Sequence, residues 1–208
     1  MAIVINGSGT VTGLAVGGLP DGTVDAGTLA TDSVTAAKLE VSAITNADLP
    51  AGNVLQVVST TKSDLFTLTS LTFTDVTGLA ATITPTSSSS TILVVVNMMM
   101  SAHRRYAAVK LLRGSTVIGI GDAASNRARV TMGCSSNDQE TNGIYVSSNA
   151  SATYKDSPST TSATTYKIQV GSLDDPAAAI KINSGSADAD AAYTTRGIST
   201  ITLFEIGA

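Results

Sequence analysis

Several kinds of residue are scarce in this chain of 208 residues, and each scarcity narrows the possible functions. Cys134 is the single cysteine, so no disulfide can form within one chain, and stability must come from packing or association. Charged residues make up 13% of the chain, against roughly 25% in an ordinary soluble domain. A net charge of −4 offers no basic surface to nucleic acid, and the absence of Trp leaves few rings for base stacking. We therefore expect no nucleic-acid partner.

Long apolar runs are also missing. The longest, residues 92–100, is about half of the ~20 residues that a membrane-spanning helix needs, and Asn97 interrupts it. The first residues contain neither the basic region nor the apolar stretch of a signal peptide. We expect no membrane insertion, and a chain with one thiol suits assembly in a reducing cytoplasm.

Apolar and hydroxyl-bearing residues are abundant instead. Hydrophobic residues account for 43% of the chain, which is enough to build a core, and much of the polarity comes from Ser and Thr. Such side chains suit half-buried strands, Thr especially because it is β-branched. The composition predicts an all-β protein.

Residues 53–208 alternate short apolar runs with clusters of Ser, Thr, Gly, Asn and Asp, as strands alternate with turns. Tyr166, Ile168 and Val170 would share one buried face of a strand, and 79–84 shows the same alternation. No segment has a sustained helical stripe, so a β-sandwich of jelly-roll type is expected for this head. The predicted strands are 54–59, 64–70, 79–84, 91–102, 107–112, 116–120, 128–132, 143–148, 165–170, 178–182 and 198–206.

Two further features of this region are specific. Arg113, Gly114 and Ser115 lie between two apolar runs and predict a hairpin turn, in which Gly supplies a positive φ. Residues 92–96 and 98–100 are apolar on both faces of the expected strand. One face would meet the sandwich core and the other a neighbouring subunit; the alternative is a central strand covered by a loop.

The first fifty residues contain an internal repeat with a period of ten residues. The copies are 12–19, 22–29, 32–39 and 42–49. Each copy holds a large apolar residue at its start and end and a small residue between them. The first apolar position is Leu14, Val24, Val34 and Ile44, the small one is Gly17, Gly27, Ala37 and Ala47, and the last is Leu19, Leu29, Leu39 and Leu49.

Five residues separate the apolar positions, which would put them on opposite faces of a straight strand. Short extended pieces that alternate with a turn or one helical turn, as 35–39 suggests, would bring them to one side. So few apolar residues cannot enclose a core, so we expect three copies to wind around a common axis. A flexible linker is the alternative. Pro50 to Asn53 end the repeats. The chain is therefore divided into an N-terminal anchor before the repeats (1–11), a stem (12–50) and a head (53–208).

With these motifs in place, the chain resembles tailed-phage virion proteins, particularly the tail-fibre and receptor-binding proteins of phages from marine and freshwater bacteria. Residues 32–39, Asp-Ser-Val-Thr-Ala-Ala-Lys-Leu, are similar to the Val-Thr-x-x-Lys-Leu units of such fibres. Residues 54–60, 74–85, 87–96, 156–158 with 165–166, and 199–206 resemble successive landmarks of their β heads, and 112–116 resembles the central hairpin.

The resemblance implies a non-enzymatic homotrimer on the surface of a phage particle, with a jelly-roll head and an N-terminal segment that joins other virion proteins. The expected function is attachment to a host-surface glycan or protein. Only four repeats are present and no coiled coil follows them, which favours the alternative, a capsid- or neck-decorating protein that stabilises the particle.

The sequence contains few candidate catalytic residues and no catalytic motif. His103 is the sole histidine, and no Gly-x-Ser-x-Gly motif accompanies it, so a strand-end or interface role beside Arg104 and Arg105 is favoured over a catalytic triad. The pairs Asp174–Asp175 and Asp188–Asp190 could in principle serve a glycosidase, but both lie in turn-like sequence. We predict no catalytic, cofactor-binding or metal-binding residue.

Polar loops are the remaining candidates for recognition. They are Asn142–Gly143, 147–152 and 184–188. Asp188 and Asp190 in and beside the last of them could hold a calcium ion, but the EF-hand pattern is absent and ordinary Asp turn chemistry is favoured. The sequence does not single out a binding residue among these loops.

Overall fold

The structure is a computed structural model that describes residues 4–5, 11–12, 29, 31, 33–40, 43–45, 48–102, 106–135, 147–175 and 179–208. The elements in these ranges are β-strands and one turn of 3₁₀ helix, so the described chain is all-β, as predicted. Two compact units are present, Met1–Asp48 and Leu49–Ala208. The sequence-based boundary near residue 52 lies close to this division. None of the described residues belongs to a helix long and apolar enough to cross a membrane.

The N-terminal unit contains little regular structure in its described residues. Strands β1 (Val4–Ile5) and β2 (Val11–Thr12) pair antiparallel, and η1 (Ala36–Lys38) forms a single 3₁₀ turn. The turn falls inside the 35–39 segment for which the repeat predicted one helical turn, so that prediction is confirmed.

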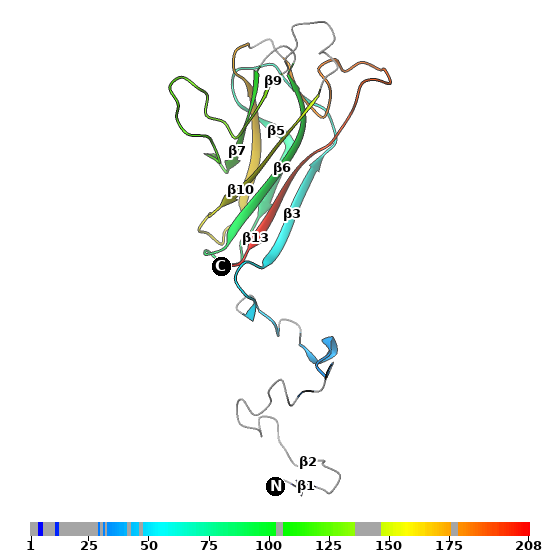
Figure 1. The fold of residues 1–208 in the computed structure, drawn as a ribbon, viewed down its shortest axis with the longest axis vertical. Coiled ribbons are helices and arrows are strands. Elements are labelled where there is room, and N and C mark those ends of the chain that lie inside the picture. Colours follow the sequence, from blue (N-terminus) through cyan, green and yellow to red (C-terminus); the bar gives the residue numbers. More distant parts are fainter. Residues whose placement is uncertain are drawn as a thin grey trace. The chain divides into compact units, whose positions relative to one another are not determined.

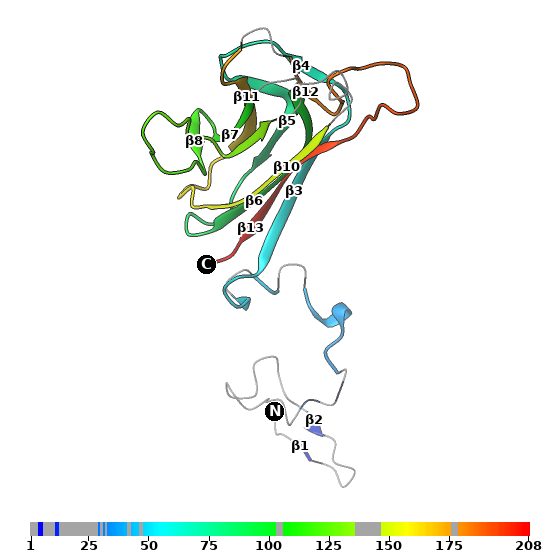
Figure 2. The ribbon, with the colours of Figure 1, turned by 45° about the horizontal axis from the view of Figure 1, so that its top comes forward.

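The C-terminal unit, the head, is built from two antiparallel sheets that face each other (Figures 1 and 2). We call the sheet that faces the viewer in Figure 1 the front sheet; β10, β6, β13 and β3 lie side by side in it. Its strands are β3 (Val54–Lys62), β4 (Phe66–Leu68), β6 (Thr91–Ala102), β10 (Ser148–Asp156), β12 (Ile180–Ile182) and β13 (Ser199–Ile206).

The second sheet, the back sheet, has β5 next to β11, and β11 next to β7. Strands β8 and β9 both pair with the free side of β7, β8 near its end and β9 near its start. The strands are β5 (Thr74–Ile83), β7 (Tyr106–Arg113), β8 (Thr116–Ile118), β9 (Met132–Ser135) and β11 (Thr164–Ser172).

The core lies between the two sheets and follows the period-two alternation of the strands. Inward side chains such as Val94, Leu111, Ile168 and Leu203 are fully buried, so the predicted burial of Tyr166, Ile168 and Val170 is confirmed. In β5 a bulge opposite β11 resets the alternation, and Gly78 takes a φ of 82° there. The regular alternation therefore starts only at 79, whereas β5 itself begins five residues earlier.

Other strand predictions meet mixed outcomes. Residues 91–102 match β6 at both ends, and Gly114, with φ 58°, turns the predicted hairpin between β7 and β8. The predicted strand 128–132 is wrong, because β9 begins only at Met132. The predicted loop at 147–152 is also wrong: it belongs to β10 from Ser148 onward, paired with β6 along its whole length. Most of predicted strand 143–148 lies outside the described residues.

Candidate functional site

The described apolar residues of the stem point into solvent rather than into a core. Leu29, Val34, Leu39 and Ile44 are between 44% and 56% exposed, and they follow one another at intervals of five residues. The same interval leads to Leu49 and Val54 in the head unit, which are 40% and 53% exposed. We call this series of six residues the apolar ladder. Exposed large apolar residues at a fixed period are typical of a surface that other chains cover.

Regular turns accompany the ladder and keep its period. The carbonyl oxygens of Thr35, Glu40 and Thr45 each accept a hydrogen bond from the backbone N–H three residues later, at 2.9–3.0 Å. Each of these turns directly follows a ladder residue. The backbone N–H and the hydroxyl of Thr45 both donate to Asp48. These hydrogen bonds, the backbone one most strongly, lower the pKa of that carboxyl group. Where the stem is described, each five-residue step thus consists of one apolar residue followed by one turn.

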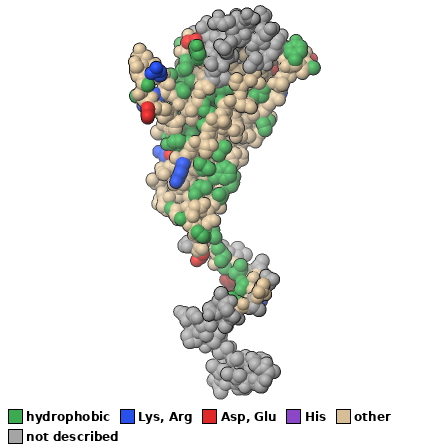
Figure 3. Space-filling model, in the orientation of Figure 1, with side chains coloured by type: hydrophobic (Ala, Val, Ile, Leu, Met, Phe, Trp, Pro, Cys, Tyr) green, Lys and Arg blue, Asp and Glu red, His purple; other side chains and the backbone are tan. Residues whose placement is uncertain are grey.

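The outward side chains of β3, β13, β6 and β10 form a second exposed surface, which we call the front face. The strand register arranges them in rows. Apart from Lys155, the two rows nearest the start of β3 are apolar, and apart from Val95, the next two rows consist of Ser, Thr and Asn. Figure 3 shows this face as largely hydrophobic and uncharged polar. The rows are Val54 and Ile206; Val57, Phe204, Leu93 and Lys155; Ser59, Thr202, Val95 and Thr153; and Thr61, Thr200, Asn97 and Ser151.

The outward side chains of β5, β11 and β7, the back face, have a different chemistry. Lys167 Nζ lies 2.7 Å from Asp75 Oδ2, and Gln169 donates to the other carboxylate oxygen at 2.8 Å. The hydrogen bond from Lys167 is the main reason that the pKa of Asp75 is lowered. Lys110 Nζ lies 3.8 Å from the centre of the Phe73 ring. The back face therefore pairs its charges within the chain, as a solvated surface does.

A hollow of about 390 Å³ opens where the front face ends. It is lined by Asn97, Met98, Met99, Asn149, Ala150, Ser151 and Ile198. Met99 is covered by the segment before β13, because a Cβ added to Gly197 would collide with Met99 Sδ. The predicted alternative of a strand under a loop therefore holds at Met99, while its inward neighbours Met98 and Met100 lie in the core.

The loop 183–198 connects β12 to β13, which pair with different stretches of β6: β12 with 100–102 and β13 with 91–97. A buried network fixes its ends. Asn183 donates to the carbonyl oxygens of Lys62 and Asp64 at 2.9 and 3.0 Å, and Ser199 donates to Asn183 Oδ1 at 2.6 Å. Asn183 has a positive φ of 68°, which Asn tolerates better than most residues. The loop thus begins and ends on a rigid base.

Within this loop the predicted candidate Asp188 has protein partners. Arg196 Nη2 lies 2.7 Å from its carboxylate, and Ser184 donates to Oδ1 at 3.2 Å. Thr194 donates to the carbonyl oxygens of Ala189 and Ala191. Asp188 thus stabilises the loop in this structure, and Asp190 is exposed. Among the described residues no group of three or more His, Cys, Asp or Glu gathers as a metal site would.

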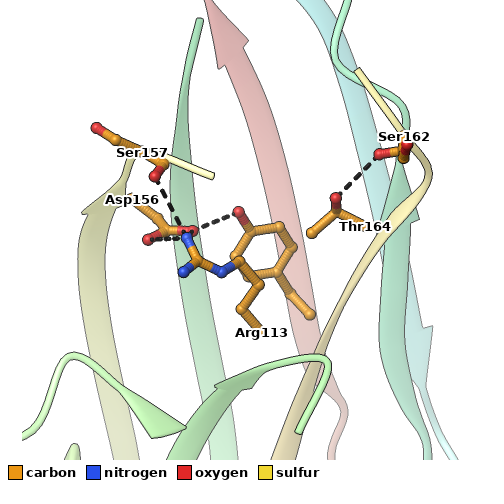
Figure 4. A network of polar contacts seen from close by, with 6 residues as sticks. Arg113, Asp156, Ser157, Ser162 and Thr164 are labelled. Carbon is orange, nitrogen blue, oxygen red and sulfur yellow. Dashed lines mark hydrogen bonds and ion pairs between the residues drawn. The ribbon is translucent and has the colours of Figure 1, made fainter. Parts of the chain in front are cut away.

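A second polar network joins the two sheets (Figure 4). Asp156, at the end of β10, accepts from Arg113 of β7 at 2.9 and 3.0 Å and from the Tyr166 hydroxyl of β11 at 2.6 Å. Burial, followed by the hydrogen bond to Asp156, raises the pKa of Tyr166 far above its usual value. The phenol therefore remains a donor, and the network holds the edge of the front sheet to the back sheet.

Glu205 is a fully buried carboxylate in β13. Gln56 donates to one of its oxygens at 2.5 Å, and the N–H and hydroxyl of Thr86 donate to the other at 2.7 Å. Burial by itself raises the pKa of Glu205, but the hydrogen bonds from Gln56 and Thr86 outweigh it and lower the pKa overall. This arrangement satisfies a charge in the interior and offers no free base.

The other candidates from the sequence fall partly outside the described residues. His103, Arg104, Arg105 and the Asn142–Gly143 loop lie outside the described residues. Asp174 and Asp175 follow β11 and have contacts of their own. Of the predicted recognition loops, residues 184–188 alone are described as a loop. The apolar ladder was accessible to sequence reasoning through its period, whereas the rows of the front face required the register of the strands.

Comparisons with known proteins do not assign the chain to a family. A scan of protein-family models and a search of curated proteins both found no match to the chain.

Proposed function

We propose that this chain is a structural subunit of a bacteriophage particle, a homotrimeric tail-fibre or appendage protein that serves attachment to the host surface. The resemblance of residues 32–39 and of the head landmarks to phage virion proteins motivates the proposal. It assigns no catalytic residue, cofactor or metal. The N-terminal segment would join other virion proteins, and the head would present its loops outward.

The apolar ladder is the observation that carries the proposal. Leu29, Val34, Leu39 and Ile44 are large, exposed and evenly spaced, and one such residue in every five is too few for the segment to build its own core. Burial of each side chain is worth about 1.5–3 kcal/mol, which association with other copies would recover. Parallel copies wound around one axis would bring equivalent ladder residues to the same level.

The strand order supports a jelly-roll head. Along the chain the strands β3, β5, β6, β7, β9, β10, β11 and β13 are arranged as β3-β13-β6-β10 in the front sheet and β5-β11-β7-β9 in the back sheet. The first strand therefore lies beside the last and the second beside the next to last, as in a chain folded back on itself and then rolled. Such a rigid scaffold suits the display of loops.

The mass of the purified full-length protein in solution tests the proposed homotrimer directly. Analytical ultracentrifugation or mass photometry of the full chain should give about three times 21.0 kDa. A stable monomer at micromolar concentration would contradict the homotrimer. Purified protein should also cleave no bacterial surface polysaccharide, and reproducible turnover on one would overturn the non-enzymatic part of the proposal.

A capsid- or neck-decorating protein is the second candidate. The small number of repeats, four, favours it because a longer fibre would need a longer stem. Electron microscopy of particles labelled on this subunit separates the two functions: label on the tail supports attachment, and label spread over the capsid supports decoration.

A further inference from the structure

The front face carries apolar side chains where a solvated sheet would carry polar ones. Val57 is 53% exposed, and Phe204 and Leu93 stand beside it in the same row. Lys155 is the charged side chain among the front-face residues defined above. A patch of this kind on a chain that is otherwise rich in Ser and Thr marks a contact surface.

The back face of the same sandwich serves as an internal reference. Its strands have the same alternation, yet its outward positions include Asp75, Lys167 and Lys110, each in contact with a partner within the chain. The apolar Tyr106 and Leu112 also lie on this side, the first exposed and the second buried. Both faces belong to one domain, so the difference does not arise from the overall composition. The front face is thus the side of the head that is suited to being covered.

The apolar ladder indicates what covers it. Leu49 and Val54 continue the five-residue interval of the stem into the head unit, and Val54 is paired with Ile206 in the first row of the front face. The surface that the stem offers to other copies is therefore continuous in sequence with the apolar rows. A nearly uncharged surface can also meet a second copy of itself without repulsion between like charges.

We propose that the apolar rows of the front face, centred on Val57, Phe204 and Leu93, pack against other copies of this chain. The proposal rests on the homotrimer proposed above and extends its contacts from the stem into the head. The contact is confined to the rows near the start of β3, because the later rows carry Ser, Thr and Asn with Val95 as their one apolar member.

The size of the face limits how much it can contribute. Strands about 4.8 Å apart and about 3.3 Å of rise per residue give roughly 500 Å² for four strands over about eight residues. A stable interface buries about 800 Å² on each partner, so the front face is too small to hold heads together without the stem. It orients heads that the stem has already brought together.

Cysteine labelling of the full chain tests this contact. In a Cys134→Ser background, Val57→Cys places a thiol on the front face and Ala80→Cys places one on the back face; both positions are exposed and both lie on edge strands. In the trimer we expect a maleimide to react about tenfold more slowly at position 57 than at position 80. Adding Leu93→Lys to the Val57→Cys variant should restore fast labelling, because the new charge lies in the same apolar row.

The outcomes separate this proposal from the proposed function. Equal labelling rates in a protein that sediments as a trimer would overturn the head contact and leave the homotrimer intact. Equal rates in a monomer would overturn both. Slow labelling at position 57 in a monomer would mean that another part of the same chain covers the face, which also overturns the proposal. Slow labelling in the trimer, reversed by Leu93→Lys, would establish it, and slow labelling that Leu93→Lys leaves unchanged would overturn it.

Discussion

The described large apolar side chains of the stem are exposed, whereas those of the head strands are mostly buried. In the described stem, residues such as Val34 and Leu39 recur at every fifth position and are exposed, whereas in the head residues such as Val94 and Leu203 recur at every second position and are buried. A strand with period two can hide its apolar face against a second sheet of the same chain. A five-residue repeat with one apolar position has no such partner. The head should therefore be stabilised within one chain and the stem between chains.

The largest effect is expected from breaking the ladder. Val34→Asp together with Leu39→Asp should abolish the trimer. The two substitutions remove six apolar side chains from a trimer, two from each chain, and at about 1.5 kcal/mol each this is roughly 9 kcal/mol of lost burial. Sedimentation measures the loss, and denaturant unfolding of the head should be unchanged. The matched control, Ser33→Asp with Thr35→Asp, adds the same charge off the ladder and should remain trimeric. A trimer that survives the ladder variant would refute the role of the stem.

The next largest effect concerns the core of the head. Leu203→Ala should lower the free energy of unfolding by about 2–5 kcal/mol, because a fully buried side chain is replaced by a cavity. Thr200→Ala, on the outward side of the same strand, should change it by about 0.5 kcal/mol or less. Urea titrations at two protein concentrations measure both. If the head is stabilised within one chain, the loss will not depend on concentration; a strong dependence would count against the comparison.

A smaller effect is expected at the network between the sheets. Tyr166→Phe removes the hydroxyl that donates to Asp156 at 2.6 Å, while Arg113 still contacts that carboxylate. The loss should be about 1.5 kcal/mol, the value of a hydrogen bond to a charged group. Tyr106→Phe makes the same chemical change at a side chain that is 59% exposed and should have almost no effect. Equal unfolding midpoints for the two variants would show that the network does not stabilise the head.

The smallest effect depends on pH. The pKa of Glu205 is lower in the folded head than its ordinary value of about 4.3. Its stabilisation is thus complete above that value and is lost as the pH falls through the lower, folded-state pKa. Unfolding measured between neutral pH and pH ~3 should show a smaller loss of stability for Glu205→Gln than for the wild type. Identical slopes in the two proteins would exclude this carboxylate as a source of acid sensitivity.

Strands of the head could be predicted where the apolar pattern of their own residues is strong. Residues 91–102 are apolar enough to be recognised as β6, and Gly114 marks the hairpin between β7 and β8 by the positive φ that it allows. Strand β10 was missed because its inward positions include Ala150 and Ala152, which are too small to give a hydrophobic alternation. Its pairing with β6 supplies the hydrogen bonds that make it a strand.

The polar interior was likewise beyond sequence reasoning. Asn183 and Lys62 are distant in the chain, and neither belongs to a motif, yet they share a buried network at the base of the loop 183–198. Asp156 and Arg113 meet only because β10 and β7 lie in facing sheets. Burial of such groups requires partners, and those partners come from whichever strands the fold brings together.

The sequence by itself determined the all-β class, the position of the repeat and the five-residue interval of its apolar residues, because composition and period are local properties that survive in any fold. The tertiary structure decided which side of each sheet faces outward, and it brought Val57, Phe204 and Leu93 into one row. That row exists because strands distant in the chain pair in a particular register, and a shift of one residue would turn these side chains toward the core.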